Sequence, residues 1–202
     1  HTINLARGLD LSVDLANGHA DLHMADMSIP GRGRDLVVNR TWDSALAQNS
    51  ATAGTHGWVS SLGPSMGGTL TSTVLYTDSS GAVWPFRYTG SLGAAPPYSA
   101  YATPGGLPWQ LYTSTSGYEL LNILSGEQLL FDALGRYVQD KDTYDNTNTL
   151  GYTSTASTPV SETNSGGRTI YLYYTGSGQL DAVQSPLANA SADAQGQLVA
   201  NG

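Results

Sequence analysis

The sequence contains one short cluster of residue types that bind metal ions. His19, Asp21 and His23 alternate with two apolar residues, so on a β-strand the three side chains lie on one face. Two imidazoles and a carboxylate are ligands that Zn²⁺ accepts, which makes these residues a candidate metal site. The alternative is the solvent-facing side of a hairpin, since Asn17-Gly18 just before them is a strong two-residue turn signal.

A second cluster, Gly31-Arg32-Gly33-Arg34, has the makings of an anion site. Turn amides and two guanidinium groups together could bind an anion. The formal net charge of −8 opposes this reading, because an acidic surface repels anions. We therefore favour a structural turn whose arginines pair with acidic neighbours such as Asp26 or Asp35.

Aromatic residues surround a Pro- and Gly-rich loop at residues 90–108. Exposed aromatic rings on a β-sheet can stack against sugar rings, which predicts a carbohydrate-binding or adhesive surface. The alternative is that the rings close the edge of the sheet as part of its core. The five residues are Trp84, Tyr98, Tyr101, Trp109 and Tyr112.

Catalytic motifs are missing from the sequence. It has no Cys and four His, and it contains no Gly-x-Ser-x-Gly elbow, His-Glu-x-x-His helix or phosphate-binding loop. Carboxylate pairs such as Asp140 and Asp142 occur in turn-rich stretches, where capping of backbone amides explains them. We expect no catalysis and no cofactor, and a hydrolase is the least favoured reading.

The composition favours an exported all-β protein. The 202 residues include 24 Gly and 12 Tyr but only 12% charged residues, a balance that suits short strands joined by Gly-rich turns. At a net charge of −8 the chain gains nothing from nucleic-acid phosphates or anionic membranes. No stretch approaches the roughly 20 apolar residues of a membrane span, so we expect no membrane insertion. No charged-then-apolar leader opens the sequence, and we expect an excerpt of a longer bacterial extracellular or cell-surface chain.

Strand patterns occur every 8–12 residues, separated by turn signals, and helical periodicity is confined to residues 46–53. This spacing predicts an antiparallel β-hairpin meander in one curved sheet rather than alternating strands and helices. The predicted strands are residues 9–15, 20–24, 36–42, 58–62, 69–76, 83–89, 110–113, 118–124, 128–132, 136–140, 150–154, 169–174 and 179–183.

Two segments share a repeat. The first runs Leu130-Phe131-Asp132-Ala133-Leu134-Gly135-Arg136-Tyr137-Val138-Gln139-Asp140, and the second runs Tyr173-Tyr174-Thr175-Gly176-Ser177-Gly178-Gln179-Leu180-Asp181-Ala182-Val183. In each, the Asp or Thr side chain can accept a turn amide, and the Gly just before the second strand supplies a positive φ. This pattern predicts a tight hairpin. A unit of this size cannot bury its own apolar face, so copies must pair edge to edge.

The first of these segments resembles the Rhs/YD-repeat family, whose repeat core is Tyr-Asp-x-x-Gly-Arg-Leu. Upstream, Asp26 to Gly33, then Arg40-Thr41-Trp42-Asp43-Ser44, then Gly57-Trp58 resemble the module that opens many Rhs proteins. The second segment departs from the repeat because Thr175 replaces its Asp. The residues that carry the resemblance are Asp26, Pro30, Gly31, Arg32, Gly33, Arg40, Trp42, Trp58, Phe131, Asp132, Gly135, Arg136, Tyr174 and Gly178.

The resemblance implies a structural role in a large secreted or surface protein. Rhs-type chains spiral long antiparallel sheets into a shell that encloses or presents a C-terminal effector. It implies an N-terminal module at residues 1–76, YD-type hairpins at 77–187 and a polar tail at 188–202. The expected partners are the rest of the parent chain and its effector. Because unpaired strand edges associate, we also expect an edge-strand homodimer through residues 169–183 or 9–15.

Overall fold

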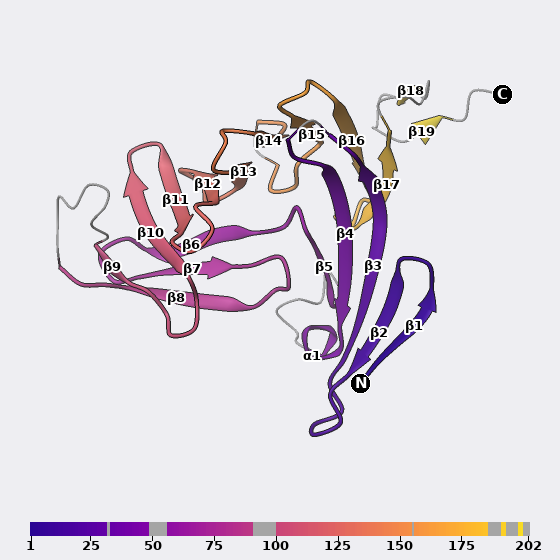
Figure 1. The fold of residues 1–202 in the computed structure, drawn as a ribbon, viewed down its shortest axis with the longest axis horizontal. Helices are drawn as coiled ribbons and strands as arrows, with labels where there is room; N and C mark the ends of the chain where they lie inside the picture. Colours follow the sequence, from indigo (N-terminus) through magenta and orange to yellow (C-terminus); the bar gives the residue numbers. More distant parts are fainter. Residues whose placement is uncertain are drawn as a thin grey trace.

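The computed structural model is all-β, in antiparallel hairpins, as the sequence predicts. It describes residues 1–31, 33–48, 56–90, 100–154 and 156–185. It also places the backbone of a strand pair, β18 (Ser191–Ala192) and β19 (Leu198–Val199). Three larger sheets follow one another along the chain, and each is a meander in which every strand pairs with the next (Figure 1).

The N-terminal sheet has five strands in chain order. They are β1 (Thr2–Ala6), β2 (Leu9–Val13), β3 (Ala20–Ile29), β4 (Leu36–Asp43) and β5 (Trp58–Ser60). The predicted edge strand at residues 9–15 is internal instead, because β1 pairs along its free side.

A single helical turn, α1 (Ser44–Ala47), follows β4. It begins earlier than the helical periodicity at residues 46–53, because the Asp43 carboxylate accepts the amides of Ala45 and Leu46 at 2.7 and 3.0 Å. Such an N-cap fixes where a helix starts. Residues 49–53 of that prediction lie outside the described residues.

The second sheet has four strands: β6 (Ser65–Thr69), β7 (Thr73–Thr77), β8 (Val83–Tyr88) and β9 (Tyr101–Ala102). Gly67 and Gly68, which fall between the predicted strands at residues 58–62 and 69–76, lie inside β6. The module boundary expected at residues 76/77 falls within β7. The turn that follows β7 leads directly into its partner strand β8, so the chain stays in one sheet at this point. The first sheet ends at Ser60 and the second begins at Ser65.

The third sheet has eight strands, which also pair in chain order. Figure 1 shows it curving over the other two sheets until its last hairpin lies beside β3 and β4. The strands are β10 (Trp109–Ser114), β11 (Gly117–Asn122), β12 (Gln128–Asp132), β13 (Tyr137–Lys141), β14 (Thr147–Gly151), β15 (Ser161–Asn164), β16 (Thr169–Tyr174) and β17 (Leu180–Gln184).

Five hairpin turns in the described residues share one structure. In each, the carbonyl of the first residue accepts the amide of the fourth, and the amide of the first residue donates to the carbonyl of the fifth. The side chain of the first residue also accepts the amide of the fifth. The fourth residue has a positive φ, between 62° and 85°. The turns span residues 78–82, 132–136, 142–146, 164–168 and 175–179.

The core lies where the three sheets meet. Leu36 of β4, Phe86 of β8 and Leu120 of β11 are fully buried, one from each sheet. Phe131, the aromatic of the predicted repeat, packs edge-on against Tyr76 of the second sheet, with ring centroids 6.0 Å apart. Each such side chain contributes about 1.5–3 kcal/mol on burial, so the hairpins are stable because they cover one another.

Candidate functional site

The connection between β3 and β4 is the most elaborate polar site in the described residues. Pro30 ends β3, and the Asp35 carboxylate accepts the Gly31 amide at 2.9 Å. A β-carbon at Gly31 would lie 2.1 Å from the Arg34 carbonyl oxygen, and one at Gly33 would lie 2.3 Å from the Asn146 side chain. The two glycines are therefore required by close contact, and the loop sits directly on the long sheet.

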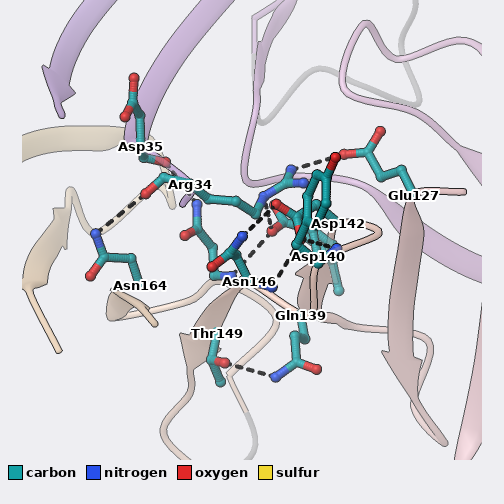
Figure 2. A network of polar contacts seen from close by, with 12 residues as sticks. Arg34, Asp35, Glu127, Gln139, Asp140, Asp142, Asn146, Thr149 and Asn164 are labelled. Atoms are coloured by element: carbon teal, nitrogen blue, oxygen red, sulfur yellow. Dashed lines mark hydrogen bonds and ion pairs between the residues drawn. The ribbon is translucent and has the colours of Figure 1, made fainter. Parts of the chain in front are cut away.

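Arg34 anchors this loop to the long sheet. Its Nε lies 2.7 Å from Asp140 Oδ1 and its Nη2 lies 2.8 Å from Glu127 Oε1. Its carbonyl oxygen faces the Asn164 amide at 3.4 Å (Figure 2). Arginine presents several donors in a fixed plane, which suits it to hold two carboxylates at once.

Asp140 is buried and well supplied with donors. Besides Arg34, the backbone amide of Asn148 donates to Oδ1 at 3.2 Å and the Tyr137 hydroxyl donates to Oδ2 at 2.8 Å. Burial raises the pKa of Asp140, and the charge of Arg34 opposes that rise. Burial also raises the pKa of Tyr137 well above its usual value, so its hydroxyl keeps its proton.

The sequence placed the partners of this arginine wrongly. Asp35 bonds to Gly31 with its side chain, and Asp26 pairs with Arg40 at 2.6 Å. Arg34 instead binds two carboxylates of the third sheet and its turns, Asp140 and Glu127. Glu127 is 93 residues away in the sequence. The reading of the Gly-Arg motif as a structural turn fits the geometry, whereas an anion would compete with carboxylates already in place. Arg32 lies outside the described residues.

Arg40 forms a second link between the first and third sheets. It holds Asp26 with two hydrogen bonds of 2.6 and 2.7 Å and donates to the Leu180 carbonyl at 3.2 Å. Its guanidinium lies 5.5 Å from the centre of the Trp58 ring, close enough for a cation–π contact. Trp42 pairs with Trp58 across β4 and β5 and donates its indole N–H to the backbone carbonyl oxygen of His56.

A pocket of about 490 Å³ lies beside this link. Trp58 and Arg40 line one side, Tyr174 and Gly178 of the last hairpin line the other, and Pro159 closes it. The pocket therefore follows the seam between the first sheet and the end of the third.

The structure regroups the predicted metal ligands. His19 Nε2 lies 2.9 Å from Asp43 Oδ1 and 3.4 Å from Asp21 Oδ1, and these three residues could together hold a cation. His23 is directed to Thr41, with 3.2 Å between Nδ1 and Oγ1. The Asp43 hydrogen bond raises the pKa of His19. Since the same Asp43 oxygen caps α1, the His19 contact reads as an extension of that cap.

The predicted sugar-binding aromatics do not form one exposed surface. Tyr101 and Tyr112 are 6% and 7% exposed, so their rings belong to the core and cannot stack on a ligand. The Trp84 indole donates to Asp78 at 2.8 Å, and Trp109 packs partly buried against the core. Tyr98 lies outside the described residues. The correction has a simple cause: β9 and β10 bring residues 101 and 112 beneath neighbouring strands.

The first predicted repeat makes contacts well beyond its own hairpin. Asp132 accepts the amides of Leu134 and Arg136 and also bonds the Arg136 guanidinium at 2.7 Å. Arg136 then donates to the Ala156 carbonyl at 3.0 Å and lies 4.6 Å from the Tyr152 ring centre. The repeat thus braces the long sheet against the loop that precedes β15.

Sequence reasoning missed Glu127, Asn148, Glu162 and Asn164, which hold or surround the loop at residues 30–35. A buried polar residue in a strand gives no apolar periodicity. Two arginines in a glycine-rich turn signal that acceptors are needed, but not where they are.

Comparison of the sequence with models of protein families and with curated proteins finds no match. No helix in the described ranges has the length and apolar character needed to cross a membrane.

Proposed function

We propose that this chain is a structural wall segment of a large exported bacterial protein of the Rhs/YD-repeat type, and that it carries no reaction of its own. In this proposal the wall encloses or presents a C-terminal effector of the parent chain. The proposal rests on the sequence resemblance and on one structural observation, the way that the third sheet is built.

That observation is the strict order of β10 to β17. Each of the eight strands pairs with its sequence neighbour, and none of the three large sheets closes on itself within the described residues. Strand addition at the β17 edge would therefore lengthen the sheet without rearranging it. A meander of this kind is suited to forming a wall of any length from repeated hairpins.

The Arg34 and Arg40 links support the same role. They fasten the first sheet to the middle and the end of the curved sheet, through Asp140 on β13 and through the Leu180 carbonyl on β17. These contacts fix the curvature of the sheet, which a shell requires.

Cryo-electron microscopy of the full-length gene product tests the proposal. We expect another antiparallel strand on the outer edge of β17 and a sheet that continues around a hollow interior. A β17 edge exposed to solvent, on a separate closed domain, would contradict a wall.

Edge pairing between copies is a secondary part of this proposal. The sheet edges in the described residues include β17 and β1, whereas residues 9–15 lie inside the first sheet. Light scattering of the 202-residue chain over a hundredfold range of concentration should show a dimer at the upper end. A monomer throughout would remove edge pairing without touching the wall proposal.

A further inference from the structure

Two buried oxygen atoms under the Arg34 loop have no hydrogen-bond partner. They are Glu162 Oε2 and Asn148 Oδ1, on side chains whose residues are 3% and 4% exposed. Buried acceptors in folded proteins nearly always have a donor, so both atoms require an explanation.

The orientation of the Asn148 amide is fixed by its neighbour. Its Nδ2 donates to the Asp35 carbonyl oxygen at 2.8 Å. Rotating the amide by half a turn would place two oxygens against each other and lose that bond. Asn148 Oδ1 is therefore an acceptor that needs a hydrogen-bond donor from another group.

None of the hydrogen bonds described above gives Glu162 Oε2 a donor. Glu162 lies within hydrogen-bonding reach of the Asn148 side chain, and the charges near it are those of Asp140 and Arg34. As a carboxylate, Asp140 only accepts hydrogen bonds, and the Arg34 Nε and Nη2 are directed to Asp140 and Glu127.

The remaining strands leave the same gap. The nearby Tyr137 on β13 donates its hydroxyl hydrogen bond to Asp140. The residues opposite Glu162 on β14 and β16 are Leu150 and Ile170, which have no polar side-chain atoms. The missing donor can be supplied by Glu162 itself.

We propose that Glu162 is a proton-binding site that controls how firmly the loop at residues 30–35 is held on the long sheet. In the protonated form, its O–H donates to Asn148 Oδ1 and satisfies both orphan atoms. The amide then presents Nδ2 to the Asp35 carbonyl. Loss of the proton leaves two facing acceptors and a second carboxylate beside Asp140, which weakens the attachment of the first sheet to the third.

The electrostatics agree with this geometry. Burial, together with the nearby charge of Asp140, raises the pKa of Glu162 to about 7, against an ordinary value of 4.5, although the contact with the Asn148 side chain and the charge of Arg34 lower it. Between these two values the folded chain binds a proton that the unfolded chain does not. The stabilisation is therefore complete below about pH 4.5 and is lost as the pH rises to about 7,.

Thermal and urea unfolding of the wild type and Glu162→Gln between pH 4 and pH 8.5 tests the proposal. The wild-type folding equilibrium should fall as the pH rises from about 4.5 to 7, by up to about 300-fold over the full shift,. A glutamine amide donates to Asn148 Oδ1 at every pH, so the variant should lose this dependence and be the more stable protein at pH 8. Glu119→Gln, on β11 of the same sheet, is the matched control and should keep the wild-type dependence.

Infrared spectroscopy of the wild type gives a second readout that does not require a variant to fold. A protonated carboxyl band should persist at pH 6 and vanish above pH 8, and Glu162→Gln should lack it. Wild-type and Glu162→Gln curves with the same pH dependence, or no such band at pH 6, would overturn the proposal. Stabilisation by added Ca²⁺ with no pH effect would also overturn it, by placing a cation between the two oxygens.

Discussion

The turns at residues 132–136 and 175–179 have the same backbone but different surroundings. In both, the fourth residue donates its amide to the first at 2.9 Å, and Gly135 and Gly178 have φ values of 79° and 81°. The Asp132 turn contacts the second sheet, since the Met66 amide donates to the Gly135 carbonyl at 2.8 Å. A β-carbon at Gly178, by contrast, would have nothing within 4 Å.

The difference separates two roles of the repeat. A Gly at the fourth position and any side-chain acceptor at the first are enough to close the hairpin, as Thr175 does. The Asp132 and Arg136 pair adds a contact network that reaches Ala156 and Tyr152. In this molecule, the full Asp-x-x-Gly-Arg pattern marks the turn that also braces other parts of the fold.

Replacing each glycine by alanine should separate the two turns most strongly. Gly135→Ala places a β-carbon 2.0 Å from the Met66 carbonyl oxygen in a left-handed conformation, and we expect a loss of about 3 kcal/mol or more. Gly178→Ala meets only the conformational cost, about 1 kcal/mol. Urea denaturation measures both. Equal losses would show that contact with the second sheet contributes nothing.

Removing the first side chain of each turn should give the next largest difference. Asp132→Ala leaves two turn amides and the Arg136 guanidinium without their acceptor, and we expect a loss of about 2–3 kcal/mol. Thr175→Ala removes a long hydrogen bond of 3.2 Å from the Gln179 amide and an exposed hydroxyl contact of 2.8 Å with Ser177, together worth about 0.5–1 kcal/mol. The free energies of unfolding in urea, compared with the wild type, decide whether the Asp turn is the stronger brace.

Much of the fold follows from local sequence patterns. The strands at residues 128–132 and 169–174 match their predicted bounds, because apolar side chains and flanking turn residues mark both ends. β15 escaped prediction because its sequence, Ser-Glu-Thr-Asn, contains no apolar residue. Its two buried side chains are Glu162 and Asn164, so it belongs to the core through polar contacts.

The candidate site could be predicted only in part. The sequence identifies the glycines and arginines of the loop at residues 30–35 as a structural turn, but not their partners. Strand pairing explains the regrouped metal ligands as well. β3 and β4 place Asp21 directly opposite Asp43, so His19 meets a carboxylate from a neighbouring strand. Such pairings depend on register between distant segments, which local spacing does not encode.

Acid should reduce the difference in the free energy of unfolding between Asp132→Ala and Thr175→Ala. Although partial burial raises it, the pKa of Asp132 is lowered overall by hydrogen bonds from the Arg136 amide and guanidinium and by the Arg136 charge. Its stabilisation is therefore present above the unfolded pKa of about 3.9 and is lost as the pH falls through the folded value. The gap between wild type and Asp132→Ala should shrink from pH 7 to pH 3, whereas the Thr175→Ala gap should stay constant. A constant Asp132→Ala gap would show that the carboxylate charge has no part in bracing the turn.

Restoring the repeat pattern in the weaker turn should have the smallest effect. In Thr175→Asp, the new carboxylate can accept the amide of residue 177 as well as that of Gln179, as Asp132 does at the matching positions. We expect a gain of about 0.5 kcal/mol in the free energy of unfolding. Thr175→Asp combined with Gln179→Arg should add the ion pair, and the coupling between the two changes measures it. Because a β-carbon at Gly178 would have nothing within 4 Å, we expect the ion pair to contribute far less here than at Asp132 and Arg136. A coupling as large as the Asp132→Ala loss would mean that the pair stabilises the hairpin itself and not its attachment to other parts of the fold.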